Sequence, residues 1–239
     1  MAQHPNLNTI ARTSDKCYAH QGPGIGAGKD TLRFHEMMSG KQIKSSDVVL
    51  DIGYGKGASL LEVFLQRGVH ECIGVDIAQK CEDAEETAMS VPEGCVFTSF
   101  IMDVCHEELP MADDSVDVVF CTETIEHLAN PYHMVAEAKR VLKHGGFFTL
   151  AFPQPENNLG YGGGQHAHVY PGFLQKASFE RFMKQMFFRL MNREENGASA
   201  WYTFRNYKGA EVIDVFEVVS GNYNEQDLYG CLDHDFEGA

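Results

Sequence analysis

The sequence predicts an α/β fold in which parallel strands alternate with helices. A β-branched apolar run, Val48–Ile52, stops at a glycine-rich turn and is followed by a helix-like segment, Ala58–Arg67. Further apolar runs follow along the chain, and several of them end in an acidic residue. Strands that alternate with helices in this way are typical of a parallel sheet covered by helices.

The glycine-rich turn has the features of a nucleotide-binding loop. Gly53 and Gly55 let the backbone turn sharply and approach a ligand with no Cβ in the way, and Gly57 lets the next helix pack closely. The helix that follows offers free backbone N–H groups to an anionic ligand group. The first strand and its turn are therefore the predicted start of a ligand site.

Two common nucleotide sites do not fit this turn. A phosphate-binding P-loop needs Lys followed by Ser or Thr after its last glycine, and neither this turn nor residues 22–30 have that spacing. A dinucleotide-binding turn needs a third glycine where this chain has Ala58. The sequence thus argues against hydrolysis of ATP or GTP and against a standard dinucleotide site.

Four predicted strands end in carboxylates. Asp51 and Asp76 lie at the ends of the first two strands, and Asp103 and Glu123 follow the third and fourth. Ligands of open α/β sheets bind at the edge where the carboxyl ends of the strands meet. Asp76 is placed to accept hydrogen bonds from both hydroxyls of a ribose, with a strand-end or helix N-cap role as the structural alternative.

The segment from Asp47 to Pro153 resembles the class I S-adenosylmethionine (SAM)-dependent methyltransferases. That family carries an acidic residue just before its glycine turn, as Asp51 does here, and the resemblance includes the segments EHLANP and VLKHGGFFTLAFP. It implies a Rossmann-like three-layer α/β sandwich with a mostly parallel seven-stranded sheet closed by an antiparallel hairpin. It also implies SAM as the cofactor and S-adenosylhomocysteine as its product.

The resemblance also assigns cofactor contacts. Asp51 and the glycine turn are expected at the methionyl part of SAM, Asp76 at the ribose, and Asp103 with Val104 at the adenine, against which Ile77 would pack. The complete predicted set is Asp51, Gly53, Tyr54, Gly55, Gly57, Asp76, Ile77, Asp103, Val104, Thr122 and Glu123.

The second half of the chain predicts the rest of the sheet. Asn130 suits a helix N-cap, and the helix it starts is expected to run to about Lys143, where glycines stop it before a fifth strand over residues 146–153. Another helix is expected over residues 178–188. Three later segments are β-rich and could supply the hairpin: residues 189–192, 201–207 and 212–219.

The chain of 239 residues is predicted to form a single domain, 1–239. Its N-terminal segment, 1–40, has helical apolar spacing over Thr31–Met38, and by resemblance it is expected to act as a lid over the cofactor, with a plain flexible leader as the alternative. Residues 153–172, rich in glycine and amides, are expected to form a substrate loop.

The composition argues against a nucleic-acid partner and against a membrane location. The net charge of −15 argues against nucleic acid, because such binding rests largely on Lys and Arg that neutralise phosphates. No apolar run is long enough to span a membrane, and the N-terminus lacks a signal-peptide hydrophobic region, so a cytoplasmic protein is predicted. The seven cysteines show no paired zinc spacing and are interpreted as reduced thiols, mostly in the core.

The segment after the fourth strand could carry chemistry. If it begins a helical turn, Glu123, Glu126 and His127 share one face. In one interpretation His127 is a general base, with His166 as a second candidate catalytic residue. In the other, Glu123, Glu126, His127 and His168 bind a divalent metal, Mg²⁺ or Mn²⁺, because this pattern resembles the metal sites of quinone-biosynthesis O-methyltransferases and small-RNA 2′-O-methyltransferases.

Together these features predict a SAM-dependent methyltransferase that methylates a small-molecule acceptor, with a hydroxyl as the expected acceptor group. The amide, histidine and tyrosine side chains of residues 153–172 suit hydroxyl-bearing molecules better than flat apolar ones. The alternatives are a metal-dependent RNA 2′-O-methyltransferase and a SAM-binding protein without turnover. The sequence leaves the acceptor and the oligomeric state open.

Overall fold

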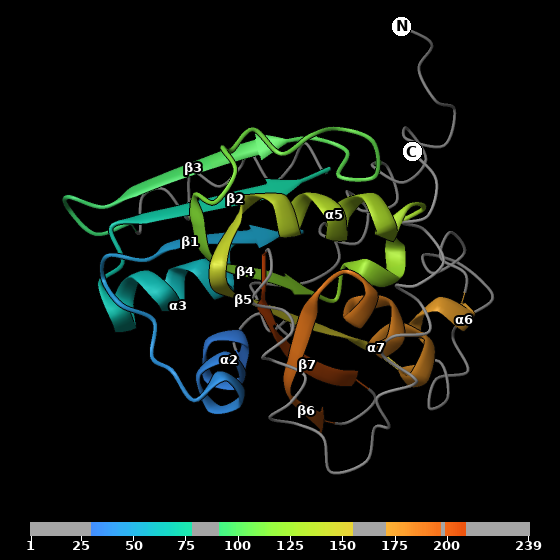
Figure 1. The fold of residues 1–239 in the computed structure, drawn as a ribbon. Helices are drawn as coiled ribbons and strands as arrows, with labels where there is room; N and C mark the ends of the chain where they lie inside the picture. Colours follow the sequence, from blue (N-terminus) through green and yellow to red (C-terminus); the bar gives the residue numbers. More distant parts are fainter. Residues whose placement is uncertain (1–29, 78–90, 155–170, 197–198, 209–239) are drawn as a thin grey trace, which may run out of the picture.

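Seven strands form one sheet in the order β3-β2-β1-β4-β5-β7-β6 in the computed structural model of the chain (Figure 1). The structure describes residues 30–77, 91–154, 171–196 and 199–208. The strands are β1 (Val48–Ile52), β2 (Glu71–Asp76), β3 (Val96–Ile101), β4 (Val116–Thr122), β5 (Leu142–Pro153), β6 (Phe188–Asn196) and β7 (Ser199–Asn206). The helices are α2 (Thr31–Ser39), α3 (Ala58–Arg67), η3 (Ile125–His127), α5 (Pro131–Val141), α6 (Pro171–Leu174) and α7 (Lys176–Gln185).

The strand directions confirm the predicted fold class. Strands β1 to β5 pair in parallel, whereas β7 runs antiparallel to both β5 and β6. The order reverses between β1 and β4, because the chain builds outward from β1 to β3 and then returns to the other side of β1. Such a reversal is where ligands of open α/β sheets bind.

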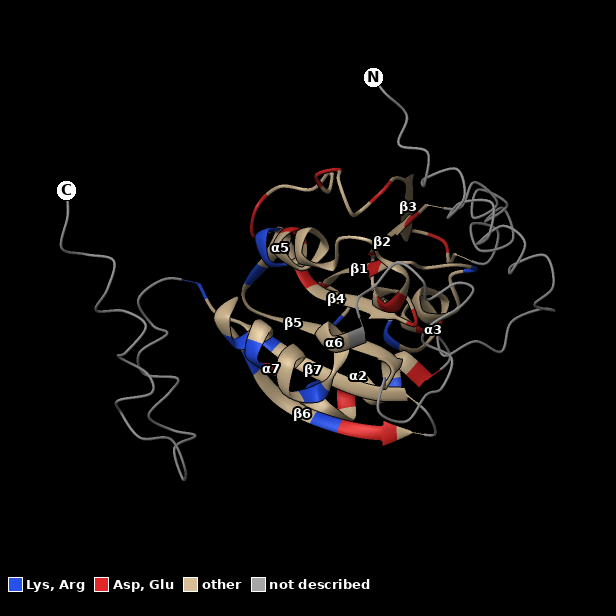
Figure 2. Ribbon diagram, turned by 90° about the vertical axis from the view of Figure 1, so that its right-hand side faces the viewer, with Lys and Arg blue, Asp and Glu red and all other residues tan. Residues whose placement is uncertain are grey.

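Helices cover both faces of the sheet, as the views along and across it show (Figures 1 and 2). Alternate residues of each strand point to opposite faces, so Leu50 joins the core beneath α5 and α7, whereas Val49 joins the core beneath α3. In Figure 2, the basic residues of β6 come before the acidic residues at its end. Among the described residues, no helix has the length and apolarity of a membrane span.

Local sequence signals explain where the helices begin and end. Helix α3 has the predicted bounds and lies between Gly57 and Gly68, both in the left-handed conformation that favours glycine. Asn130 caps α5 as predicted, because its Oδ1 accepts a hydrogen bond from the backbone N–H of His133.

Several predicted boundaries were wrong by a few residues. Helix α5 ends at Val141, and β5 begins at Leu142, before the glycines that were expected to separate them. Gly145 has a φ of 78° within the strand, so it adjusts the backbone of the strand and does not end the helix. The next helix ends at Gln185, and the hairpin that closes the sheet consists of β6 and β7; residues 212–219 lie outside the described part.

Helix α2 is fixed to the α3 side of the sheet by three kinds of contact. The ring of Phe34 stacks on Trp201 of β7, with 4.4 Å between the ring centroids. Glu36 accepts two hydrogen bonds from the guanidinium of Arg67 on α3. The ring of His35 is buried and hydrogen-bonds to Thr149 of β5 at 2.8 Å. The helix is thus an integral layer of the fold, and the lid role of residues 1–40 stays a prediction.

Acidification should weaken this packing through His35. Burial lowers the pKa of His35 to about 4, so the folded state favours the neutral ring. The resulting stabilisation is present above the unfolded-state pKa of about 6.5 and is lost as the pH falls toward 4. When the pH is lowered from 7.5 to 5, we expect the free energy of unfolding to fall by about 2 kcal/mol because of His35. Urea unfolding of the wild type and of His35→Gln at both pH values measures this; an equal loss in both proteins would contradict it.

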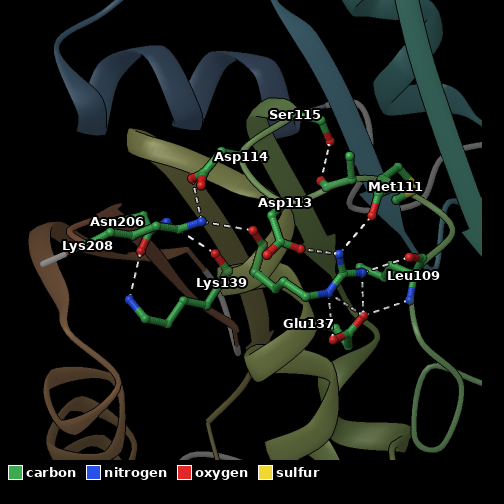
Figure 3. A network of polar contacts seen from close by, with 11 residues as sticks. Leu109, Met111, Asp113, Asp114, Ser115, Glu137, Lys139, Asn206 and Lys208 are labelled. Atoms are coloured by element: carbon green, nitrogen blue, oxygen red, sulfur yellow. Dashed lines mark hydrogen bonds and ion pairs between the residues drawn. The ribbon is translucent and has the colours of Figure 1, made fainter.

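A second polar network joins α5 to the loop before β4 (Figure 3). The guanidinium of Arg140 donates to the backbone carbonyls of Leu109 and Met111, each at 2.8 Å. It also pairs with the carboxylates of Glu137 and Asp113. The Arg140 side chain therefore provides hydrogen-bond donors to two loop carbonyls and two carboxylates. In addition, the backbone carbonyl of Arg140 accepts a hydrogen bond from Lys208, which follows β7.

Removal of this side chain should destabilise the fold. Because Arg140→Ala leaves the mostly buried Glu137 and two loop carbonyls without their donor, we expect a loss of about 3 kcal/mol in the free energy of unfolding. Arg33→Ala is the matched control, since its pair with Asp30 is exposed on both sides and should contribute less than about 1 kcal/mol. Similar midpoints in urea for the two variants would contradict the network's importance.

Candidate functional site

The glycine turn after β1 lies at the carboxyl edge of the sheet, where the strand order reverses. Gly53, Gly55 and Gly57 all have positive φ, at 78°, 53° and 74°. The turn is held by backbone hydrogen bonds from Gly53 N to the carbonyl of Val75 (2.7 Å) and from Gly57 N to that of Tyr54 (2.8 Å). All three glycines are thus required by the backbone path, and the turn fixes the N-terminus of α3.

A close contact shows why the first position must be glycine. A Cβ on Gly53 would lie 2.1 Å from Oγ1 of Thr124, which belongs to the segment after β4. The turn after β1 and the segment after β4 therefore touch at the reversal point. A ligand at this edge of the sheet would be bounded by both segments.

Two buried carboxylates flank the turn. Asp76 Oδ2 accepts a hydrogen bond from Gly55 N at 3.0 Å. Asp51 is 1% exposed, and its Oδ1 has no hydrogen-bond partner among the described residues. Burial raises the pKa of Asp51 to about 7, against the opposing effect of the nearby Ser59 hydroxyl, and the charge of Asp76 raises it further. A buried acid with an unpartnered oxygen is suited to a cationic group, such as the ammonium of SAM.

The remaining predicted cofactor residues lie at the same edge but differ in orientation. The side chain of Tyr54 packs on Gly74 in the core, where a Cβ on Gly74 would lie 2.7 Å from the ring. Tyr54 therefore contributes its backbone, and not its ring, to the glycine turn. Asp103 accepts from Cys105 N at 3.0 Å, and its Oδ2 is buried without a hydrogen-bond partner in the described residues. Val104 and Thr122 are also buried at this edge, and Ile77 follows the end of β2.

The segment after β4 does not form the predicted helical face. Glu123 N bonds to the carbonyl of Ala151 (2.7 Å), which extends the pairing of β4 with β5, and Glu123 adopts a φ of 51°. Only Ile125–His127 are helical, as a single 3₁₀ turn. The condition for a shared helical face, a helical turn that includes Glu123, is therefore not met, because a hydrogen bond to β5 holds Glu123 at the end of β4.

The three side chains still lie near one another. Glu123 lies close enough to Glu126 for each to shift the pKa of the other, and it accepts a hydrogen bond from Ser199 Oγ at 2.7 Å. Burial and the charge of Glu123 raise the pKa of Glu126 well above its ordinary value, and its Oε2 is buried without a hydrogen-bond partner in the described part of the chain. His127 Nε2 lies 3.7 Å from Glu126 Oε1 and is partly exposed. The result is a buried acid pair beside an accessible imidazole.

The described residues do not complete the predicted metal site. No group of three or more His, Cys, Asp or Glu side chains among them is arranged to hold a metal ion. A raised pKa on Glu126 also works against metal ligation, since ligating carboxylates must be deprotonated. His166 and His168 lie outside the described residues, so the fourth predicted ligand and the second predicted catalytic histidine have no observed position.

Three hydroxyl groups near the site were not singled out from the sequence. Ser59, in the first turn of α3, donates a hydrogen bond to Oγ1 of Thr31 in α2 at 3.3 Å. The sequence could have indicated Ser59, because it is a polar residue on the apolar face of the predicted helix, next to the glycine turn. No local signal pointed to Ser199, because the antiparallel hairpin brings it to Glu123 from 76 positions away.

Comparison with known proteins gives a family match for the middle part of the chain. Residues 50–150 match the model of the methyltransferase domain family. This part of the chain is a methyltransferase domain, and its fold is that of solved SAM-dependent methyltransferases. The match begins in β1, includes the glycine turn and ends in β5.

Curated relatives of the methyltransferase domain include enzymes that act on different atoms. The sarcosine/dimethylglycine N-methyltransferase of Aphanothece halophytica is 31% identical over 111 residues, which are 46% of this chain and 39% of that protein. The 27-O-demethylrifamycin SV methyltransferase of Amycolatopsis mediterranei is 32% identical over 124 residues, 50% of this chain and 44% of that protein. The chain thus spans less than half the length of these relatives.

Solved structures share the fold over most of the chain. A chain from the Haloferax volcanii complex that contains the Trm112 methyltransferase activator has a TM-score of 0.67 and 16% identity, and covers 84% of this chain and 99% of its own length. The [4+2]-cyclase SpnF has a TM-score of 0.60 and 15% identity, with 85% and 95% covered. At these identities the likeness concerns the fold of the methyltransferase domain.

Proposed function

We propose that the protein transfers a methyl group from SAM to a small-molecule acceptor. The observation that carries the proposal is the buried, unpartnered oxygen of Asp51 beside a glycine turn whose three glycines all have positive φ. A structural acid would be expected to have its hydrogen-bonding capacity filled. An ammonium group on a bound SAM would fill it.

Different described residues would bind different parts of SAM. Asp51 and the glycine turn would hold the methionyl part, and Asp76, fixed by Gly55 N, would accept the ribose hydroxyls. Asp103, with its buried Oδ2, would accept from the adenine. The charge of these acids favours a positively charged ligand over an anionic nucleotide.

The proposed acceptor group is a hydroxyl. SAM supplies a methyl group on a cationic sulfur, so the S–CH₃ bond breaks as the O–CH₃ bond forms, and the acceptor must lose its hydroxyl proton. His127 is the proposed base for that proton, because it is the exposed member of the cluster after β4. Glu126 lies buried beneath it, with Oε1 3.7 Å from His127 Nε2, and would fix the orientation of the imidazole.

A nitrogen acceptor is the second candidate. An amine acceptor that carries a positive charge before reaction would donate hydrogen bonds to the carboxyl groups of Glu123 and Glu126. The relatives act on nitrogen in one case and oxygen in another, as their names state. Methyl-transfer assays on pairs of acceptors that share a skeleton and differ only in an –OH or –NH₂ group distinguish a hydroxyl acceptor from an amine acceptor.

Two rival functions predict different results. A metal-dependent RNA 2′-O-methyltransferase would incorporate methyl groups at RNA 3′ ends only with Mg²⁺ or Mn²⁺. A SAM-binding protein without methyl transfer would bind the cofactor and give no methylated product, and SpnF illustrates that this fold serves a cyclase. The proposed cytoplasmic location is compatible with each of the three.

The deciding experiment is calorimetry of SAM and S-adenosylhomocysteine on metal-stripped protein, followed by methyl-transfer assays on small hydroxyl and amine acceptors. We expect cofactor binding without added metal and product with a small acceptor. Repetition with Mn²⁺ and with Glu126→Ala tests the metal site. If neither nucleoside binds, the proposed function is wrong.

A further inference from the structure

A buried side-chain amide directly follows β5. Gln154 is 2% exposed, and its Nε2 has no hydrogen-bond partner among the described residues. Its Oε1 accepts a hydrogen bond from Nη2 of Arg193 at 3.0 Å. Because a guanidinium only donates hydrogen bonds, the amide oxygen must face Arg193 and the amide nitrogen must point away from it. The N–H donors of Gln154 are therefore held in one orientation inside the fold without a described acceptor.

Arg193 is itself fixed between strands. It lies on β6 opposite Tyr202 of β7, and its Nε donates to the Tyr202 hydroxyl at 3.0 Å. Its guanidinium also pairs with Glu195 at 2.8 Å, and its side chain is 17% exposed. The guanidinium thus reaches across β7 to the end of β5. Since a buried donor without an acceptor costs free energy, a fold that fixes the Gln154 amide in this way indicates a ligand atom that pairs with it.

Gln154 lies in the part of the carboxyl edge that the proposed SAM contacts leave free. Those contacts are at the ends of β1, β2 and β3, whereas β5 lies on the far side of β4. Pro153, the residue before Gln154, pairs with Ser199, whose Oγ donates to Glu123. Glu123 begins the segment after β4 that also contains His127, the proposed base. An acceptor that reaches this segment would therefore lie next to the end of β5.

We infer that the Gln154 amide binds a second oxygen of the methyl acceptor, and that Arg193 is the positioning residue that keeps the amide nitrogen turned toward it. The substrate class is a molecule with a neutral oxygen, a hydroxyl or a carbonyl, close to the hydroxyl that is methylated. The inference rests on the proposed function, and both residues lie outside the family match over residues 50–150.

The charges around the amide favour a neutral oxygen over a carboxylate. The charge of Arg193 is offset by its pair with Glu195. Glu180 of α7 has Oε1 buried without a hydrogen-bond partner in the described part of the chain. Burial raises the pKa of Tyr202, and the nearby charge of Glu180 raises it further, so this acid lies beside the same phenol that Arg193 contacts. A ligand carboxylate would add a further negative charge to these surroundings.

The experiment measures methyl transfer to acceptors with and without a second oxygen. The probes are 1,2-cyclohexanediol against cyclohexanol, and catechol against phenol. In the wild type we expect kcat/KM per hydroxyl to be at least about tenfold higher for the diol of each pair, because only the diol fills the buried donor. Comparison of this ratio between proteins cancels the intrinsic reactivity of the probes and the fraction of folded enzyme.

Three variants separate the roles. Gln154→Glu keeps an oxygen for Arg193 but has no N–H group, so the diol preference should fall about tenfold. Arg193→Met leaves the amide free to rotate, and the preference should fall about threefold through a higher KM for the diol. Glu195→Gln is the matched control, because it removes only the exposed pair of Arg193 and should keep the preference within about twofold.

A binding measurement covers the case without turnover. The side-chain N–H signals of Gln154, identified in nitrogen–proton spectra by their absence in Gln154→Glu, should shift when a diol is added to the S-adenosylhomocysteine complex, and not with cyclohexanol or phenol. No shift with either diol, or a diol preference that persists in Gln154→Glu, overturns the inference while the proposed function stands. If the wild type binds no S-adenosylhomocysteine, the proposed function itself is wrong.

Discussion

Replacing Asp76 by Ala is expected to raise the Kd of S-adenosylhomocysteine about 10- to 100-fold. The carboxylate would accept hydrogen bonds from the ribose hydroxyls, and a loss of about 1.5–3 kcal/mol, the contribution of one hydrogen bond to a charged group, corresponds to this rise. Asp76 is buried, and its Oδ2 is already fixed by Gly55 N, so little ordering is needed when the ligand binds. Isothermal titration calorimetry measures the effect.

Asp117→Asn is the control for the Asp76 experiment. Asp117 lies near the start of β4, at the opposite end of the strand from the glycine turn, where it bonds to Val48 N and to Lys143. Its replacement should leave the affinity for S-adenosylhomocysteine unchanged. Wild-type affinity in Asp76→Ala would remove Asp76 from the cofactor site.

Replacing Gly53 by Ala should both destabilise the fold and abolish tight cofactor binding. At a φ of 78°, an Ala residue is strained, and its Cβ would lie 2.1 Å from Thr124 Oγ1. The strain and the overlap together predict a loss of about 4 kcal/mol in the free energy of unfolding. Urea unfolding gives this loss, and calorimetry on the folded fraction gives the affinity.

Gly40→Ala separates backbone strain from overlap. Gly40 has a similar φ of 67°, but a Cβ there would have nothing within 4 Å. We expect this variant to lose about 1–2 kcal/mol, the cost of the left-handed conformation alone, and to bind S-adenosylhomocysteine normally. If the two variants were equally stable, the contact between the glycine turn and Thr124 would not constrain the site.

The fold was predictable where local signals agree with tertiary packing. The bounds of α3 follow from glycines on both sides, and the start of α5 follows from an Asn cap and a Pro in the first turn. The boundary between α5 and β5 was missed because a glycine pair is a helix-stop signal, whereas pairing of β5 with β4 already begins at Leu142. Long-range pairing thus overrode a local signal.

The sequence predicted the cofactor residues of the site better than the conformation of the segment after β4. Strand-end acids such as Asp51 and Asp76 follow from the rule that ligands bind at the carboxyl edge, and the structure places both beside the glycine turn. The conformation of Glu123 depends on its bond to Ala151, and its contact with Ser199 depends on the hairpin. Neither leaves a periodic signal in the sequence near Glu123.

The place of β7 in the sheet sets an order of events during synthesis. β7 is made after β6 but lies between β5 and β6, and its register with β5 pairs Phe147 with Arg205 and Pro153 with Ser199. While the chain emerges from the ribosome, the outer edge of β5 therefore stays without its partner until residue 205 is available. The β6–β7 hairpin can form locally, and its docking then closes the sheet. A nascent chain halted before Ser199 would carry the whole cofactor half and an open strand edge exposed to aggregation.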